Sequence, residues 1–88
     1  MKYVYRVEIN LSFDYIIDGV LKNDDTNLVK KIIAENHRDL MSKIEKLFVT
    51  WWDDPKTLSK EGLNVDIVPK SLKWDITKLE RGTWIDIE

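Results

Sequence analysis

The chain contains no cysteine among its 88 residues, which removes disulfides, thiolate nucleophiles and almost every structural zinc site. Its three glycines argue against a glycine-rich phosphate loop. The single histidine, His37, has neither a cysteine nor a Gly-x-Ser-x-Gly stretch to act with, so we expect it to have a structural or surface role. These absences predict a protein that is not an enzyme and that has no cofactor and no metal site.

Long apolar runs and an excess of basic residues are also absent. No uninterrupted apolar run exceeds three residues, so we expect a soluble, cytoplasmic chain without membrane association. Fourteen basic and sixteen acidic residues give a net charge of −2, which argues against a non-specific nucleic-acid binder. Ten isoleucines accompany a single alanine, and eleven lysines accompany three arginines, as in AT-rich coding sequences. That bias suits a low-GC bacterium or its phages.

The strongest pattern lies at the start of the chain, where every odd position from Tyr3 to Tyr15 is apolar or aromatic. Such alternation predicts a β-strand with one buried face. Asp18 and Gly19 suit a type I′ turn, which would fold residues 20–22 back on residues 15–17. The apolar residues between 13 and 21 also have helical spacing, which allows a short helix instead. We favour the hairpin.

A second pattern follows, with apolar residues at helical spacing from Val29 to Trp51. It predicts one long amphipathic helix over roughly residues 26–52, packed on a sheet. Asp24 and Asp25 suit the N-terminus of this helix, because carboxylates favour the positive end of the helix dipole. Asp-rich residues 23–26 lack the alternating ligands and the glycine of an EF-hand loop, so a helix cap explains them better than calcium does.

The helical spacing predicts different environments for the two adjacent tryptophans. Trp51 falls within the apolar stripe and is expected in the core, whereas Trp52 falls at its edge and is expected to be partly exposed. Asp53 and Asp54 should end the helix, since carboxylates are unfavourable at a C-terminus and the residue before proline avoids helical angles. Asp54 and Pro55 should then open a short helix that ends at Gly62.

The remaining sequence predicts three strands, at residues 63–68, 72–77 and 83–87, with turns at residues 69–71 and 79–82. The turn at 79–82 would pair Ile76 with Ile85 on one face. On the other face it would place Asp75 opposite Asp86, and Thr77 opposite Trp84. Because like charges across a strand pair are unfavourable, this arrangement has two explanations: solvated surface, or an acidic and aromatic patch for a basic partner.

These patterns predict a single α+β domain with two layers, in which an antiparallel sheet of four or five strands packs on one long helix and a short helix follows Pro55. We expect a non-catalytic protein-binding module, in the manner of an accessory or inhibitory protein of a phage or mobile element. Its basic partner would contact two acidic-aromatic patches, formed by Trp84, Asp75 and Asp86 and by Trp52, Asp53 and Asp54.

Two alternatives remain open. Tyr3, Tyr5, Phe13, Tyr15, Trp74 and Trp84 could include a stacking platform for single-stranded nucleic acid, although most of them share a face with core residues and no ribonucleoprotein consensus is present. Exposed tryptophans could instead form the interface of a homodimer.

Overall fold

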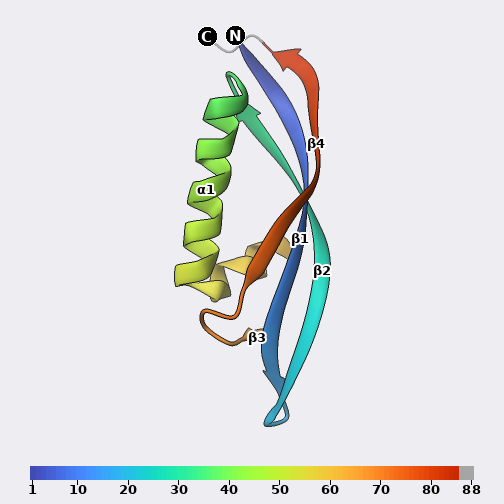
Figure 1. The fold of residues 1–88 in the computed structure, drawn as a ribbon, viewed down its shortest axis with the longest axis vertical. Helices are drawn as coiled ribbons and strands as arrows, with labels where there is room; N and C mark the ends of the chain where they lie inside the picture. The colour runs from blue at the N-terminus through green and yellow to red at the C-terminus, as the bar shows by residue number, and fades with distance from the viewer. Residues whose placement is uncertain (86–88) are drawn as a thin grey trace.

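The computed structural model describes residues 1–85, with side chains described as far as residue 82, and it is an α+β fold with an open, antiparallel, four-stranded sheet. Both helical segments lie on one side of the sheet (Figure 1), so the predicted two-layer fold class is confirmed. The elements, in chain order, are β1 (Lys2–Ile17), β2 (Val20–Ala34), α1 (His37–Asp53), the 3₁₀ helix η1 (Pro55–Glu61), β3 (Asp66–Ile67) and β4 (Lys73–Ile85).

Strand β1 is the centre of the sheet. It pairs with β2 along one edge, and with β4 and the short β3 along the other. Its odd residues from Tyr5 to Phe13 are buried while its even residues are not, which confirms the predicted alternation. Strands β2 and β4 each have one strand neighbour within residues 1–85.

The predicted hairpin at Asp18 and Gly19 is confirmed, and the alternative short helix is wrong. Ile17 pairs with Val20 across a two-residue turn in which Asp18 has φ 52° and Gly19 has φ 75°. Two positive φ values match the type I′ turn, whose twist suits that of the flanking strands. The resulting β1–β2 hairpin projects beyond the helical layer (Figure 1), and the molecule measures 50 × 20 × 19 Å.

The prediction of one helix over residues 26–52 is wrong in its first third, because residues 20–34 form strand β2. The even residues of β2 face α1 and the odd residues face away, so Ile32 and Ala34 are buried while Val29 and Ile33 are exposed. β-Branched residues favour this extended conformation, and the long β1 provides a full-length partner for it. Asp24 and Asp25 therefore lie in a strand, not at a helix N-terminus.

The actual helix α1 begins at His37, after Asn36. The Asn36 side chain accepts a hydrogen bond from the Asp39 backbone N–H at 2.9 Å, as an N-cap does. The Asp39 carboxylate in turn accepts a hydrogen bond from the Glu35 backbone N–H at 3.0 Å and lies 3.2 Å from the Lys43 ammonium. Two unpaired amides at the start of the helix are thus satisfied by side chains.

The end of α1 agrees with the sequence prediction. Trp51 is 2 % exposed and Trp52 is 37 % exposed. The helix stops at Asp53, and the Asp54 side chain accepts a hydrogen bond from the Lys56 backbone N–H, which starts η1. Gly62 ends η1 with φ 91°, in the left-handed region that glycine enters without strain.

The predicted pair of strands at residues 72–77 and 83–87 is wrong, because residues 73–85 form the single strand β4 without a turn at 79–82. Two irregularities in the pairing with β1 replace that turn. One of them lies opposite Val4, between Arg81 and Trp84. There a Cβ on Gly82 would lie 2.6 Å from the Val4 carbonyl oxygen, so only glycine fits this close approach. The predicted strand at 63–68 shortens to β3.

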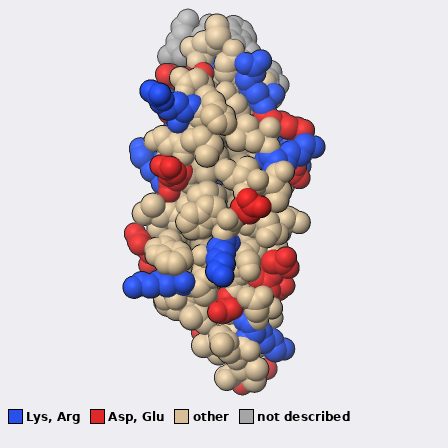
Figure 2. Space-filling model, in the orientation of Figure 1, with Lys and Arg blue, Asp and Glu red and all other residues tan. Residues whose placement is uncertain are grey.

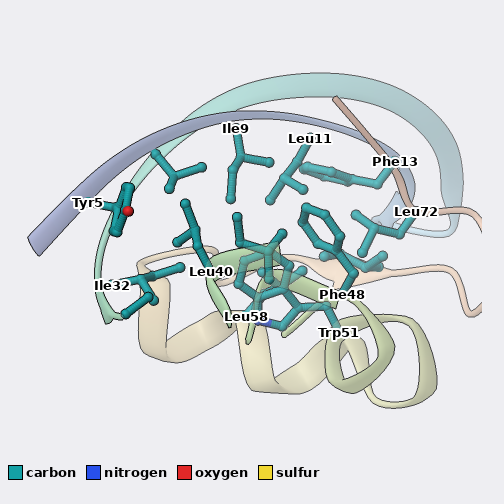
Figure 3. Packing of buried hydrophobic residues seen from close by; sticks show 14 residues of the cluster. Tyr5, Ile9, Leu11, Phe13, Ile32, Leu40, Phe48, Trp51, Leu58 and Leu72 are labelled. Carbon is teal, nitrogen blue, oxygen red and sulfur yellow. The ribbon is translucent and has the colours of Figure 1, made fainter. Parts of the chain in front are cut away.

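The hydrophobic core lies between the inner face of the sheet and the two helical segments, as Figure 3 shows. Tyr5, Ile9 and Leu11 of β1 face Leu40 and Phe48 of α1 across this layer. The buried hydrophobic residues are Tyr5, Val7, Ile9, Leu11, Phe13, Ile32, Ala34, Leu40, Ile44, Phe48, Trp51, Leu58, Ile67 and Leu72.

Candidate functional site

One helix cannot cover the whole inner face of the sheet, and a groove remains between α1 and β4. The backbone of α1 lies closer to β2 and η1 than to β4, so the side of the helix toward β4 and the inner face of that strand leave an apolar channel. We call this channel the α1–β4 groove. Its residues are Met41, Ile44, Glu45, Phe48, Val49, Trp52, Leu72, Lys73, Trp74 and Ile76. Figure 2 shows mainly uncharged atoms over the strip where α1 and β4 meet.

Trp74 is the centre of the α1–β4 groove. Its indole stacks on the ring of buried Phe48, with ring centroids 4.3 Å apart and planes 23° apart. Phe48 in turn contacts Trp51, with centroids 5.7 Å apart. Trp74 itself is 42 % exposed. A large aromatic side chain is therefore held in place by the core while part of its surface faces solvent.

Trp52 supplies the second exposed indole. It lies at the last turn of α1 and lines a hollow of about 290 Å³ together with Leu72, Lys73 and Trp74. A second hollow, of about 350 Å³, shares Trp74 in its lining and is also bordered by Met41 and Val49. The two exposed tryptophans thus belong to one continuous surface.

Carboxylates accompany these rings. Glu45 lines the larger hollow, and exposed Asp53 follows Trp52 at the end of α1. Asp54 caps η1 through the Lys56 amide, which gives it a structural task. Within residues 1–85, no group of three or more histidine, aspartate or glutamate side chains is placed to hold a metal ion. His37 is exposed at the first position of α1.

The predicted patch of Trp84, Asp75 and Asp86 depends on a turn at residues 79–82, which β4 does not contain. Without the turn at 79–82, Asp75 pairs with Asn10 and Trp84 pairs with Tyr3. These two residues of β4 lie roughly 30 Å apart at about 3.3 Å per residue, and Asp75 occupies the outer face of the sheet, away from α1. Asp86 lies outside the described residues, as does the Trp84 side chain.

The aromatic residues of the sheet are mostly committed to the core. Tyr5 and Phe13 are buried, and Tyr3 is half-buried with the Arg81 guanidinium 4.6 Å from its ring centroid. Of the five candidates for a stacking platform whose side chains the structure describes, Trp74 is the one that lines an open groove. The outer face of β1 carries Val4, Arg6, Glu8, Asn10, Ser12 and Asp14.

Sequence reasoning missed two exposed apolar surfaces. The first is a second stripe along α1, formed by Met41, Glu45, Val49 and Trp52. The stronger pattern of core residues on the same helix made this stripe hard to recognise in the sequence. At the tip of the β1–β2 hairpin, four aliphatic residues flank the turn and are 45–63 % exposed: Ile16, Ile17, Val20 and Leu21. Residues that flank a turn exposed to solvent are usually polar, so four aliphatic residues around Asp18 and Gly19 could have indicated this surface from the sequence.

Within the described residues, no helix has the length and apolar character needed to cross a membrane. Comparisons of the chain with models of known protein families, with curated proteins and with solved structures found no match.

Proposed function

We propose that this protein is a non-catalytic protein-binding module whose α1–β4 groove holds an extended segment of a partner protein. The observation that carries the proposal is that Trp52 and Trp74, 37 % and 42 % exposed, line one hollow. Tryptophan is strongly enriched among residues that dominate binding energy, and exposed tryptophans gathered in one groove favour an interaction surface.

The stacking of Trp74 on Phe48 supports binding as well as packing. A ring that is already fixed loses little conformational freedom when a partner covers it. Trp74 therefore presents its open surface in a single orientation. This arrangement matches the rigid aromatic anchors found at tight protein interfaces.

The geometry of β4 indicates the form of the partner segment. Its edge away from β1 has no strand neighbour within the described residues, and Trp74 and Ile76 both direct their side chains toward the groove. A partner segment in extended conformation could add to this edge and place alternate side chains into the hollows. Apolar residues at those alternate positions would cover both tryptophans.

The carboxylates indicate the charge of the partner. Glu45 borders the larger hollow and Asp53 lies beside Trp52. A lysine or arginine in the partner segment would gain charge pairing with them and cation–π contact with an indole. The proposed ligand is thus an extended segment in which apolar residues alternate with basic ones.

Selection from a displayed library of linear peptides tests this proposal. We expect enriched peptides to combine apolar residues with lysine or arginine, and to bind about tenfold or more weakly to Trp52→Ala protein. Asp53→Asn should weaken the same peptides by a smaller factor that diminishes in high salt.

A matched control is Val65→Ser, which removes an exposed apolar side chain outside the groove. This variant should bind the selected peptides as the unaltered protein does. Peptides whose affinity ignores Trp52→Ala, while both proteins remain folded by circular dichroism, would refute the assignment of the groove.

A further inference from the structure

The edge of β2 that faces away from β1 lacks a strand neighbour within the described part of the chain. In an antiparallel pair, alternate residues direct their N–H and C=O groups away from the partner strand. In β2 these are the odd residues, because the Ile33 carbonyl accepts a hydrogen bond from the Lys43 ammonium at 2.7 Å and the Asp25 N–H donates to the Asp24 carboxylate at 2.8 Å. Such an edge is a template for another strand.

Apart from Lys22 beside the hairpin turn, the charges along β2 are arranged in two blocks. Asp24 and Asp25 lie toward the hairpin tip, and Lys30 and Lys31 lie toward α1. If a second copy of β2 ran antiparallel beside the first, the acidic block of each strand would lie opposite the basic block of the other. The edge is therefore complementary to itself in charge.

A groove beside this edge reinforces the complementarity. It lies between β2 and α1, on the side of the helix opposite the α1–β4 groove, and has a volume of about 480 Å³. Its apolar lining is formed by Ile32, Ile33 and Leu47, and four lysines surround this lining. The lining residues are Lys30, Lys31, Ile32, Ile33, Lys43, Lys46, Leu47 and Thr50. An acidic strand segment fits such a basic rim better than a basic one does.

We propose that two copies of this chain pair antiparallel through their β2 edges, with the two-fold axis beside Leu28. The pairing joins the two sheets into one continuous sheet across the dimer. It leaves the α1–β4 groove of each copy open, so this inference is independent of the proposed function. The acidic block of one copy then meets the lysines of the other at both ends of the interface.

The register follows from which charges are already paired. A two-fold axis perpendicular to the sheet keeps inner residues opposite inner residues, so residues of equal parity face each other. Lys30 already lies 2.8 Å from the Glu61 carboxylate, whereas Asp25 and Lys31 have no ion pair within the described residues. Placing Asp25 directly opposite Lys31 pairs two residues of equal parity and joins two charges that have no other ion pair. In this register Leu28 lies opposite Leu28 of the other copy.

The structure also limits the length of this pairing. The Lys43 ammonium occupies the Ile33 carbonyl, so the strand ladder ends at Lys31. By symmetry it ends at Asp25 on the other side of the axis, where the Asp25 carbonyl accepts a hydrogen bond from the Lys31 N–H of the other copy while the Asp25 N–H keeps its bond to the Asp24 carboxylate. The interface consists of residues 25–31 of each copy, with Leu28 on the inner face and Val29, which is 44 % exposed, on the outer face.

Sedimentation analysis over a range of protein concentrations tests the dimer. We expect the mass to rise from that of one 10.5 kDa chain toward that of two. Lys31→Glu should weaken dimerisation by about tenfold, because symmetry creates two repulsive pairs in place of two attractive ones. Asp25→Lys should have a similar effect, and combining Asp25→Lys with Lys31→Asp should restore the dimer.

A cross-link tests the register separately. Because the chain has no cysteine, Leu28→Cys introduces a single thiol at the axis, where directly opposed residues lie within disulfide range. Mild oxidation should give a covalent dimer in high yield, whereas Val65→Cys should not. Circular dichroism confirms that each variant is folded.

Three outcomes would overturn the proposal. The first is that the chain stays monomeric at the highest concentration. The second is that neither charge reversal changes the stability of the dimer. The third is that Trp52→Ala dissociates the dimer whereas Lys31→Glu does not. The last would place self-association in the α1–β4 groove, and peptide binding by Lys31→Glu protein would still report on the proposed function separately.

Discussion

The indole of Trp74 on β4 lies flat against the ring of Phe48 on α1, with centroids 4.3 Å apart. This contact joins an edge strand to the helix that covers the centre of the sheet. Phe48→Leu keeps an apolar side chain but removes the stacked ring and leaves a smaller group in the core. We expect it to lower the free energy of unfolding by about 1–3 kcal/mol and to reduce the near-ultraviolet circular dichroism of the tryptophans. An unchanged aromatic signal would contradict this account.

The two adjacent tryptophans should respond differently to truncation. Trp51→Ala removes a side chain that is 2 % exposed, and we expect it to cost about 3–5 kcal/mol because it leaves a large cavity. Trp52→Ala removes a ring that is already partly in solvent, so its cost should be well below that. Urea denaturation of the two variants measures the difference. Equal destabilisation would mean that Trp52 belongs to the core.

The start of α1 should show pH-dependent stability through Asp39. Its pKa is lowered from the usual 3.8, first because the carboxylate accepts the Glu35 amide hydrogen bond and second because it pairs with Lys43. Folding weakens proton binding here, so this stabilisation is present above pH 3.8 and is lost as the pH falls through the lower folded-state value. Asp39→Asn should destabilise the protein near neutral pH.

The destabilisation by Asp39→Asn should shrink as the pH falls below 3.8 and disappear once the Asp39 carboxylate is protonated in the folded protein as well. A constant difference between the two proteins across this range would show that the charge does not contribute. Asn36→Ala serves as a comparison, because loss of the N-cap should cost about 1 kcal/mol at every pH.

Gly82 should resist substitution for a steric reason. Gly82→Ala would bring a Cβ to 2.6 Å from the Val4 carbonyl oxygen, which is a backbone atom of the central strand. We expect a loss of about 1–3 kcal/mol in the free energy of unfolding, since the strand must shift. Asp75→Ala on the same strand is the control and should change stability by about 0.5 kcal/mol or less.

Nucleic-acid binding provides a further test of the charge distribution. At about 150 mM salt, we expect no binding to single-stranded RNA or DNA tighter than about 10 μM, because the net charge is −2. Fluorescence anisotropy with labelled oligonucleotides measures this directly. Submicromolar affinity that falls steeply with salt, and that falls further in Lys46→Glu protein, would instead assign the lysine-rimmed groove beside β2 to nucleic acid.

The sequence predicted the features that depend on strong local patterns. The alternation from Tyr3 to Tyr15 identified β1, and the positive-φ preference of Asp18 and Gly19 identified the hairpin. The phase of the helix near its end separated Trp51 from Trp52. In each case the residue's own preference and its tertiary environment agree.

The errors arose where pairing with β1 outweighed local preference. Val29 and Ile33 have both strand and helix spacing relative to their neighbours, and the long partner strand decided in favour of β2. In β4, the break in alternation near Leu79 and Gly82 marks irregular pairing instead of a turn. The predicted proximity of Asp75 and Trp84 required that turn, and without it the two residues lie far apart on β4.

The β1–β2 hairpin reaches past the helical layer, and this gives the molecule two regions of unequal local stability. Near Ile9 the strands are covered by α1, so we expect their amide hydrogens to exchange with solvent only when the whole domain unfolds. Between Ile16 and Leu21 no helix covers the strands, and the side chains are 45–63 % exposed. We therefore expect this arm to open more often than the covered part of the strands, and hydrogen exchange should reveal a gradient of protection along one continuous pair of strands.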